Sequence, residues 1–351
     1  MNYNYICPTN LKDGLSGFMK VRNEEAFVEA AIDSIIGSLD ELVIVYNDCT
    51  DSTPEIIERK QKEYPDKIRT YPYNNDVLAF KLSKEDFELA KSFPNDSQRL
   101  FCNQCNFALS QVRYKYALVV DADQFYFSNV IDEWRTICSM PNSVTWNLKC
   151  LVGLLFAVYL SVFRKASLVL NLSLHRFLPK GPNILYQYYW EYARWCLLKG
   201  KGCISLSGLN VFKDREWYVP FDKYNVNPPY NGEGDHLIFK VSPDTYFSKF
   251  CYLKQGYSVV EKFNHPYRVF WGGLAWFHQH ANRLSNWSKV KEIKDKHPED
   301  FVEIDCFIRM EYELVHDKLD KKVHTIYQRA IYAIVHKLGL QNIKKNIHLL
   351  K

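Results

Sequence analysis

Short apolar runs alternate with amphipathic stretches along the first 135 residues of the chain. Apolar runs of four or five residues bounded by polar turns are typical of buried strands, and apolar residues at helical spacing indicate helices. The pattern predicts strands at residues 17–21, 42–46, 68–71 and 116–120, and helices at 24–36, 53–64 and 97–112. This alternation is typical of an α/β fold, in which a mostly parallel, Rossmann-like sheet is flanked by helices.

The sequence pattern changes after residue 134, where aromatic and irregular stretches follow one another without an internal repeat. We therefore expect a first half at 1–135, a second half at 136–313 that closes over it, and a helical tail at 314–351. Residues 150–163 (CLVGLLFAVYLSVF) carry no charge, but fourteen residues fall short of the roughly 20 that span a bilayer. Burial in the core is the favoured interpretation, and a helix lying on a membrane surface is the alternative.

Two aspartates follow the strand at 116–120, in the stretch ALVVDADQFYF. Residues i and i+2 of an extended chain point the same way, so the turn can aim Asp121 and Asp123 at one point. Two carboxylates held this close favour a cation between them, and Mg²⁺ commonly completes its ligand shell with substrate phosphate. The pair therefore predicts a divalent metal that bridges the protein and a diphosphate. The structural alternative is a capped strand end followed by a turn.

A second polar group follows the strand at 42–46, in VIVYNDCTDST. A carboxylate at the end of such a strand can accept two hydrogen bonds from a nucleoside, and Asp48 has this position. Asp51 and Thr53 are suited to cap the next helix. Asn103 and Asn106 precede the aspartate pair on a predicted helix, where polar helix surface is favoured over diphosphate contact. The glycine pattern of dinucleotide-binding folds does not follow the first strand.

The net charge of +5 is concentrated near the C-terminus, because residues 318–351 alone carry +7. Apolar residues recur there at helical spacing, at positions 327, 331, 334, 335 and 338. Such a helix can bind an anionic membrane or pack on the domain with a solvated basic face, and the sequence leaves both open. Nucleic-acid binding is disfavoured, since basic and aromatic residues are not interleaved elsewhere.

The ten cysteines show no spacing typical of a disulfide framework or a zinc module, which indicates a reducing compartment. The single CxxC, Cys102 to Cys105, is interpreted as a helix with two small apolar residues. The N-terminal residues lack the basic start and apolar block of a signal peptide. We therefore expect a cytoplasmic protein.

The stretches GFMKVRNEEAF, LVIVYNDCTDSTPEII and ALVVDADQFYF together resemble the nucleotide-sugar glycosyltransferases of the GT-A fold. Among these the chain is similar to bacterial lipooligosaccharide β-1,4-N-acetylgalactosaminyltransferases, which carry a comparable RVKNE start and YNDCTD turn. The resemblance is clear from residue 17 to about residue 132. It implies a GT-A domain with an acceptor-side C-terminal half, a UDP-sugar donor, Mn²⁺ or Mg²⁺, and inverting transfer to a hydroxyl of a surface glycan or lipid-linked glycan.

The resemblance also implies roles for individual residues. It places Arg22, Asn23 and Glu24 near the nucleotide, Asp48 at the uracil, Asp121 at the ribose or the metal, and Asp123 on the metal. A downstream histidine often completes the ligand set in such enzymes, and LAWFHQHANR offers His278, with His280 as the alternate. The loop PPYNGEGDH supplies Asp235 as first choice for the catalytic base, and Glu233 as second.

A loop rich in aromatic residues and glycine is a candidate for stacking on the acceptor sugar, and it contains Trp271, Gly272, Gly273 and Trp276. Core packing is expected for at least one of the tryptophans. Two other classes of protein remain. A sugar nucleotidyltransferase usually carries a Gly- and Lys/Arg-rich loop after the first strand, and VRNEEAF is poor in both. A non-catalytic glycan-binding or assembly protein on the same fold is the second.

Overall fold

The structure is a computed structural model that describes residues 3, 5–170, 177–179, 183–223, 228–231, 236–253, 256–319, 322 and 325–351. The chain forms two compact units, each assembled from segments that are distant in sequence. Unit 1 comprises Met1–Ala122, Trp134–Pro141 and Leu237–Arg268, and unit 2 comprises Asp123–Glu133, Asn142–His236 and Val269–Lys351. The expected division into 1–135, 136–313 and 314–351 stays a prediction.

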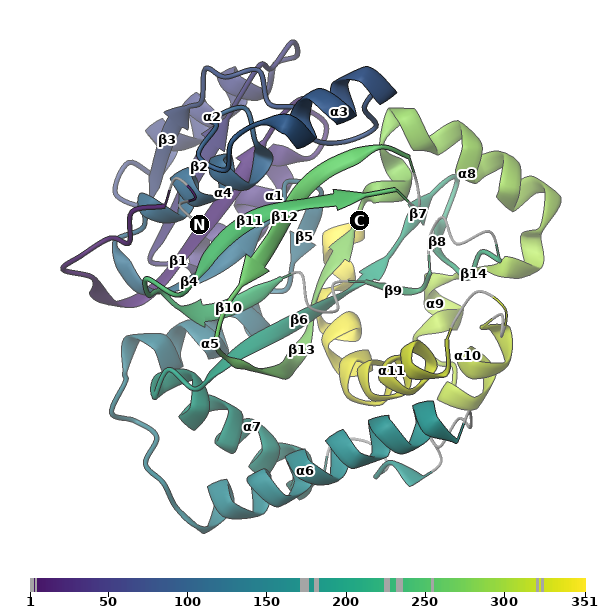
Figure 1. The fold of residues 1–351 in the computed structure, drawn as a ribbon. Helices are drawn as coiled ribbons and strands as arrows, with labels where there is room; N and C mark the ends of the chain where they lie inside the picture. Colours follow the sequence, from purple (N-terminus) through teal and green to yellow (C-terminus); the bar gives the residue numbers. More distant parts are fainter. Residues whose placement is uncertain are drawn as a thin grey trace. The chain divides into compact units, whose positions relative to one another are not determined.

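Unit 1 is built on a sheet in which β3, β2, β1 and β4 run parallel in that order, with β10 antiparallel beside β4 (Figure 1). Its strands are β1 Lys12–Val21, β2 Glu41–Tyr46, β3 Ile68–Pro72, β4 Tyr114–Val120 and β10 Leu237–Lys240, and the pair β11 Tyr246–Tyr252 and β12 Ser258–Asn264. Its helices are α1 Val28–Ile35, α2 Thr53–Glu63, α3 Lys84–Ser92 and α4 Phe101–Ser110, with the short turn η1 Ile36–Ser38.

The strands and helices predicted for the first 135 residues are confirmed, with ends that differ by up to five residues. The centres of β1, β2 and β4 are buried on both sides, because helices cover the faces of a parallel sheet. Close packing explains Gly17 on β1, where a Cβ atom would come within 2.6 Å of the Leu39 side chain. The helix α3 was not predicted; Ser83 caps it by accepting a hydrogen bond from the backbone N–H of Asp86.

Unit 2 contains a sheet in the order β6, β13, β5, with β9 on β6, and a second sheet in the order β14, β8, β7. Its strands are β5 Gln124–Tyr126, β6 Gly202–Asn210, β7 Phe212–Lys213, β8 Trp217–Pro220, β9 Tyr230–Asn231, β13 Arg268–His278 and β14 Phe301–Glu303. Its helices are α6 Leu148–Val169, α7 Ile184–Leu198, α8 Leu284–Lys296, α9 Ile304–Phe307, α10 Tyr312–Lys318 and α11 Ile326–Asn346, with the 3₁₀ turns η3 His280–Asn282, η4 Pro298–Asp300 and η5 Ile347–Leu350. Helix α5, Ser128–Ser139, begins in unit 2 and ends in unit 1.

The prediction that residues 150–163 are buried is wrong. They form the middle of α6, a helix of 22 residues that is long and apolar enough to cross a membrane, with 28% of its most apolar window buried. One face packs against α7, and the other exposes large apolar side chains. The sequence pattern gave too short an element because the uncharged stretch ends at Lys149 and Arg164. The helix itself continues past both residues.

Helix α11, the basic tail of the sequence, belongs to the core of unit 2. Ala333, Val335 and Ile343 are no more than 1% exposed. His336 is held by the Tyr230 hydroxyl at 2.6 Å and by the Met310 carbonyl at 2.9 Å, and burial lowers its pKa to about 4. The sequence left open whether the apolar face of this helix binds a membrane or packs on the domain. In the structure that face packs on unit 2.

Candidate metal centre

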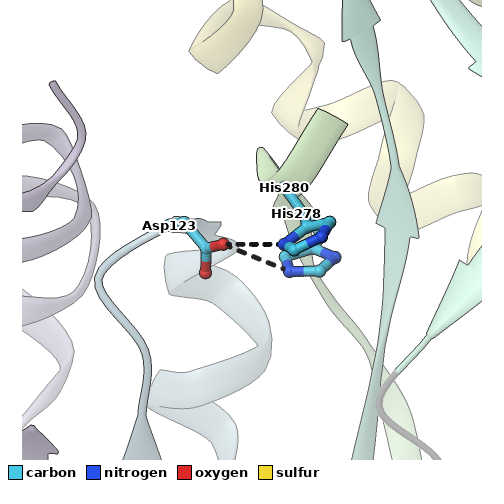
Figure 2. A group of neighbouring side chains, drawn as sticks. All are labelled: Asp123, His278 and His280. Carbon is cyan, nitrogen blue, oxygen red and sulfur yellow. Dashed lines mark ion pairs between the residues drawn. The ribbon is translucent and has the colours of Figure 1, made fainter. Parts of the chain in front are cut away.

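Asp123 lies in the turn between β4 and β5 and is 3% exposed. One carboxylate oxygen, Oδ2, lies 3.0 Å from both Nε and a terminal nitrogen of Arg283, 3.5 Å from Nε2 of His278 and 3.9 Å from Nδ1 of His280 (Figure 2). Burial by itself would raise the pKa of Asp123, but His278, Arg283 and His280 outweigh it and hold that pKa well below its usual range. Asp123 is thus a permanent carboxylate.

Strand pairing brings the two histidines to Asp123. Strands β5 and β13 run antiparallel, with Gln124 opposite His278, and the backbone N–H of Gln279 donates to the Asp123 carbonyl at 2.8 Å. His278 is the last residue of β13, and His280 begins the turn η3 that follows. The turn therefore brings His280 back to the carboxylate that His278 faces, and both imidazoles lie on one side of it (Figure 2).

Nδ1 of His278 contacts two asparagine side chains, each at 2.7 Å. The Asn231 carbonyl oxygen accepts from the indole N–H of Trp276, so its amide NH₂ faces the imidazole as a donor. The amide of Asn210 donates to the Pro228 carbonyl, so its oxygen faces the imidazole as an acceptor. Asn210 and Asn231 thus fix the ring with its Nε2 toward Asp123.

The donor set of this cluster fits a divalent metal. One oxygen of Asp123 and one ring nitrogen each of His278 and His280 lie within 4.8 Å of one another. Imidazole and carboxylate together suit Mn²⁺ better than Mg²⁺, which prefers oxygen ligands. Arg283, which sequence reasoning missed, already supplies a cation to the carboxylate, so a metal must compete with its guanidinium. A basic residue three positions after His280 was the signal available in the sequence.

Asp121 is separated from this cluster by the boundary between the units. Among the described residues, the candidate metal-binding group contains Asp123, His278 and His280 without Asp121. Within unit 1, Asp121 contributes with Cys105 and Glu261 to the electrostatic field at the buried Lys20, whose pKa is raised although burial opposes the shift. The metal role predicted for Asp121 stays a prediction.

The nucleotide-binding candidates lie at the carboxyl ends of β1 and β2, which is where open α/β sheets bind ligands. Asn23 and Asp48 both have the left-handed backbone conformation, with φ of +55° and +43°. The Asn23 side-chain oxygen accepts from the backbone N–H of Thr50 at 2.8 Å, which ties the two loops together. Arg22 and Asp48 remain exposed beside this tie, whereas Glu24 is 9% exposed.

Hydrogen bonds between the same two loops show that part of this polar cluster is structural. Asp51 accepts from the backbone N–H groups of Glu25 and Thr53, each at 3.1 Å, which agrees with its expected capping role. The Thr53 hydroxyl accepts from the backbone N–H of Glu24 at 2.8 Å. These bonds fix the loops, and they leave Arg22 and Asp48 as the side chains that can meet a ligand.

Several other predicted positions have different surroundings. Glu233 and Asp235 lie outside the described residues. Trp271 and Trp276 belong to strand β13 and not to a loop, and the buried Trp276 donates to Asn231, which confirms core packing for one tryptophan. Neither Asn103 nor Asn106 is on the helix surface as expected, since both are buried.

Both of these asparagines bind backbone groups within unit 1. Asn103 donates to the carbonyls of Asn95 and Ser97, each at 2.8 Å. Asn106 donates to the Phe247 carbonyl at 2.9 Å and accepts from the Phe247 N–H at 2.7 Å. The contacts hold their amides in the interior of the unit, so neither is available to a diphosphate.

Comparison with known proteins matches residues 8–126 to the family model of the β-1,4-N-acetylgalactosaminyltransferase CgtA. No curated protein matches the chain. Similar solved structures include S. aureus TarS in complex with UDP, 18% identical over 35% of this chain and 31% of that one, with a TM-score of 0.25. Glucosyl-3-phosphoglycerate synthase from Mycobacterium tuberculosis, in complex with Mn²⁺, UDP and phosphoglyceric acid, is 19% identical over 32% of this chain and 34% of that one, with a TM-score of 0.21.

The family match covers the stretches that carried the resemblance in the sequence, from the first strand to the aspartate pair. It confirms that residues 8–126 are similar to a glycosyltransferase family. The chain matches only about a third of the length of the two solved structures.

Proposed function

We propose that the chain is a metal-dependent glycosyltransferase that moves a hexose or an N-acetylhexosamine from a UDP-sugar to a hydroxyl of a bacterial surface glycan, such as lipooligosaccharide or capsule. The observation that carries the proposal is the cluster of Asp123, His278 and His280. It follows directly on the segment that resembles a glycosyltransferase family. A buried carboxylate with two imidazoles is a donor set for Mn²⁺, which is the partner a nucleoside diphosphate needs.

The proposal gives each candidate residue a part in donor binding. Asp48 accepts hydrogen bonds from the uracil, Arg22 and Asn23 lie along the nucleotide with Glu24, and Asp121 meets the ribose or the metal. Asp123 and His278 hold the metal, and His280 is the further ligand. When bound, the metal supplies positive charge that stabilises the departing diphosphate. The Arg283 guanidinium, which contacts the Asp123 carboxylate, would add positive charge near the departing diphosphate.

The transfer step requires a base at the acceptor hydroxyl. The hydroxyl oxygen attacks the anomeric carbon from the side opposite UDP, its proton passes to Asp235 or Glu233, and the bond to the diphosphate breaks with its electron pair on UDP. Attack from this side inverts the configuration at the anomeric carbon. In the sequence these acids stand between Asn231 and His236, outside the described residues.

The proposed location is the cytoplasm, at the inner face of the cytoplasmic membrane, where a lipid-linked glycan acceptor is in reach. Contact with anionic lipid belongs to this proposal. The basic tail was the segment expected to make it, but the apolar face of α11 is occupied by the core of unit 2.

The proposal is tested by calorimetric titration of UDP into the protein, with and without Mn²⁺. We expect binding that requires Mn²⁺ in the wild type and is lost in Asp123→Ala and in His278→Ala, because each variant removes a metal ligand. Asp317→Ala is the matched control, since Asp317 is 80% exposed in the same unit. The proteins that bind are then screened for hydrolysis of UDP-sugars.

One observation favours a second candidate, a glycan-binding or assembly protein that uses no metal. The Arg283 guanidinium compensates the buried Asp123 carboxylate without any ion. If the wild type binds UDP equally well with and without Mn²⁺, or does not bind UDP at all, the proposed metal-dependent enzyme is contradicted and this candidate is favoured. Hydrolysis or transfer that persists in Asp123→Ala would separately contradict the role given to the metal centre.

A further inference from the structure

Six large apolar side chains form an exposed row along α6, which we call the α6 ridge. They are Leu148, Leu151, Leu155, Val158, Tyr159 and Val162, each between 42% and 74% exposed. At about 100° per residue, these positions fall within about 120° of the helix circumference. The ridge is therefore one continuous apolar face, which a soluble protein rarely leaves uncovered.

The opposite face of α6 is fixed on α7, so the ridge cannot turn inward. A Cβ atom at Gly153 would come within 2.0 Å of the Tyr188 carbonyl oxygen, which shows how closely the two backbones approach. Phe156 packs edge-on against Tyr186, with ring centroids 5.2 Å apart. Figure 1 shows α6 and α7 running along each other in unit 2.

The apolar surface continues to the end of the helix and past it. Val169, Leu170 and Phe177 are 83%, 58% and 71% exposed. The Tyr159 hydroxyl donates to the Phe177 carbonyl at 3.0 Å, which joins this second set to the ridge. Aromatic side chains with a polar end, such as Tyr159, are typical of the boundary between lipid and water.

The charged residues of α6 itself are all basic, since Leu148–Val169 contains no Asp or Glu. Residues 134–190 contain six Lys or Arg and no Asp or Glu. Three of these, Lys149, Arg164 and Lys165, are exposed on α6 itself. An apolar face on a helix whose own charges are all positive is complementary to a surface that offers acyl chains beneath anionic head groups.

We propose that the α6 ridge is a membrane-binding surface that lies in the plane of an anionic phospholipid bilayer and inserts its apolar side chains among the lipids. The proposal rests on the proposed function for its biological setting and assigns the membrane contact to α6 in place of the tail. A second copy of the chain is a poorer occupant, because a symmetric pair would bring the same cations face to face without counter-charges. A helix that crosses the bilayer would have to leave α7.

The test is sedimentation of the full-length protein with vesicles of phosphatidylcholine, alone or mixed with an equal part of phosphatidylglycerol. We expect binding to the mixed vesicles that falls about tenfold or more in Leu155→Glu and again in Val162→Glu, since each loses the burial of a large apolar side chain. Lys165→Gln should weaken binding to the mixed vesicles alone. The matched control is Leu314→Glu on α10, a position that is 56% exposed.

Each variant is also titrated with UDP, so that a folding defect is seen separately. Vesicle binding with the expected losses supports the inference whether or not UDP binds, so failure of the proposed enzyme does not mask the result. No binding to mixed vesicles, or equal binding by Leu155→Glu, overturns it. A wild type that forms dimers without lipid, with a monomeric Leu155→Glu, identifies a protein interface instead. Resistance of the cellular protein to extraction at alkaline pH identifies a spanning helix and overturns it as well.

Discussion

The two asparagines in contact with His278 Nδ1 favour opposite tautomers of the imidazole. The Asn231 amide offers a donor, which suits a bare Nδ1 and leaves the proton on Nε2, where it faces Asp123. The Asn210 oxygen offers an acceptor, which suits a protonated Nδ1 and leaves the Nε2 lone pair free for a metal. The first arrangement suits the site without an ion, and the second suits the site with one.

This geometry predicts that the two asparagines are not equivalent for metal binding. In Asn210→Leu only the donor remains, so the Nε2 proton is favoured and affinity for Mn²⁺ should fall about tenfold or more. In Asn231→Leu only the acceptor remains, so affinity should be kept. Electron paramagnetic resonance of free Mn²⁺ measures both affinities, and ¹⁵N spectra of the imidazole report the tautomer. Equal losses in the two variants would contradict the assignment.

The sequence allowed prediction of the carboxylate and of one histidine, because Asp123 follows an apolar strand and His278 stands in the stretch that the resemblance indicated. It did not allow prediction of Arg283, Asn210 or Asn231. Their contacts depend on which strands pair in unit 2, and no local pattern encodes that pairing. Trp276 was ambiguous for the same reason, since burial and sugar stacking use the same residue type.

At the scale of the element, α11 links the C-terminus to the core of unit 2. Its hydrogen bonds reach several elements of that unit, among them β9 through Tyr230, β13 through the Leu274 carbonyl, and the segment before α10 through Met310. Gly339 lets α11 approach Leu274 closely, since a Cβ atom at this position would come within 2.9 Å of the Leu274 side chain. The helix is therefore part of the fold.

We expect Ile343→Ala to lower the free energy of unfolding by about 2–5 kcal/mol, because the side chain is fully buried and its loss leaves a cavity. Lys344→Ala, one residue further and exposed, should change it by less than about 0.5 kcal/mol. Urea denaturation followed by circular dichroism measures both. An unchanged midpoint in Ile343→Ala would mean that the tail is detachable from unit 2.

The uncharged stretch at 150–163 and the helical spacing in the tail indicated two apolar elements, but neither pattern identified the partner of the apolar face. The two faces look alike in sequence, yet α11 covers its own with unit 2 and α6 leaves a ridge uncovered. The distinguishing signal was the absence of acids between residues 134 and 190. It was hidden because the tail dominated the net charge.

At the scale of the whole molecule, the charge of +5 is the sum of unlike regions. Residues 134–190 carry +6 and residues 318–351 carry +7, so the remaining residues carry −8. An apolar helix beside a cationic region should bind anionic lipid by two additive contributions, one of which salt screens.

We therefore expect binding to the vesicles that contain phosphatidylglycerol to weaken as salt is raised, because the Debye length shrinks from about 10 Å at 0.1 M to about 3 Å at 1 M. A residual, salt-insensitive binding from the α6 ridge should remain and should equal the binding to phosphatidylcholine alone. Sedimentation over a series of salt concentrations measures both parts. Binding that salt abolishes would show that the ridge does not insert.

The pairing of β5 with β13 also has a consequence for synthesis of the protein. Arg283 and Asp123 are 160 residues apart, and the histidines arrive with the same late strand. A nascent chain on the ribosome therefore exposes the whole family-matched segment long before the metal centre can close. A product that ends before residue 278 retains the first sheet of the fold but lacks both imidazoles. The cluster of Asp123, His278 and His280 can therefore assemble only after residue 280 has been synthesised.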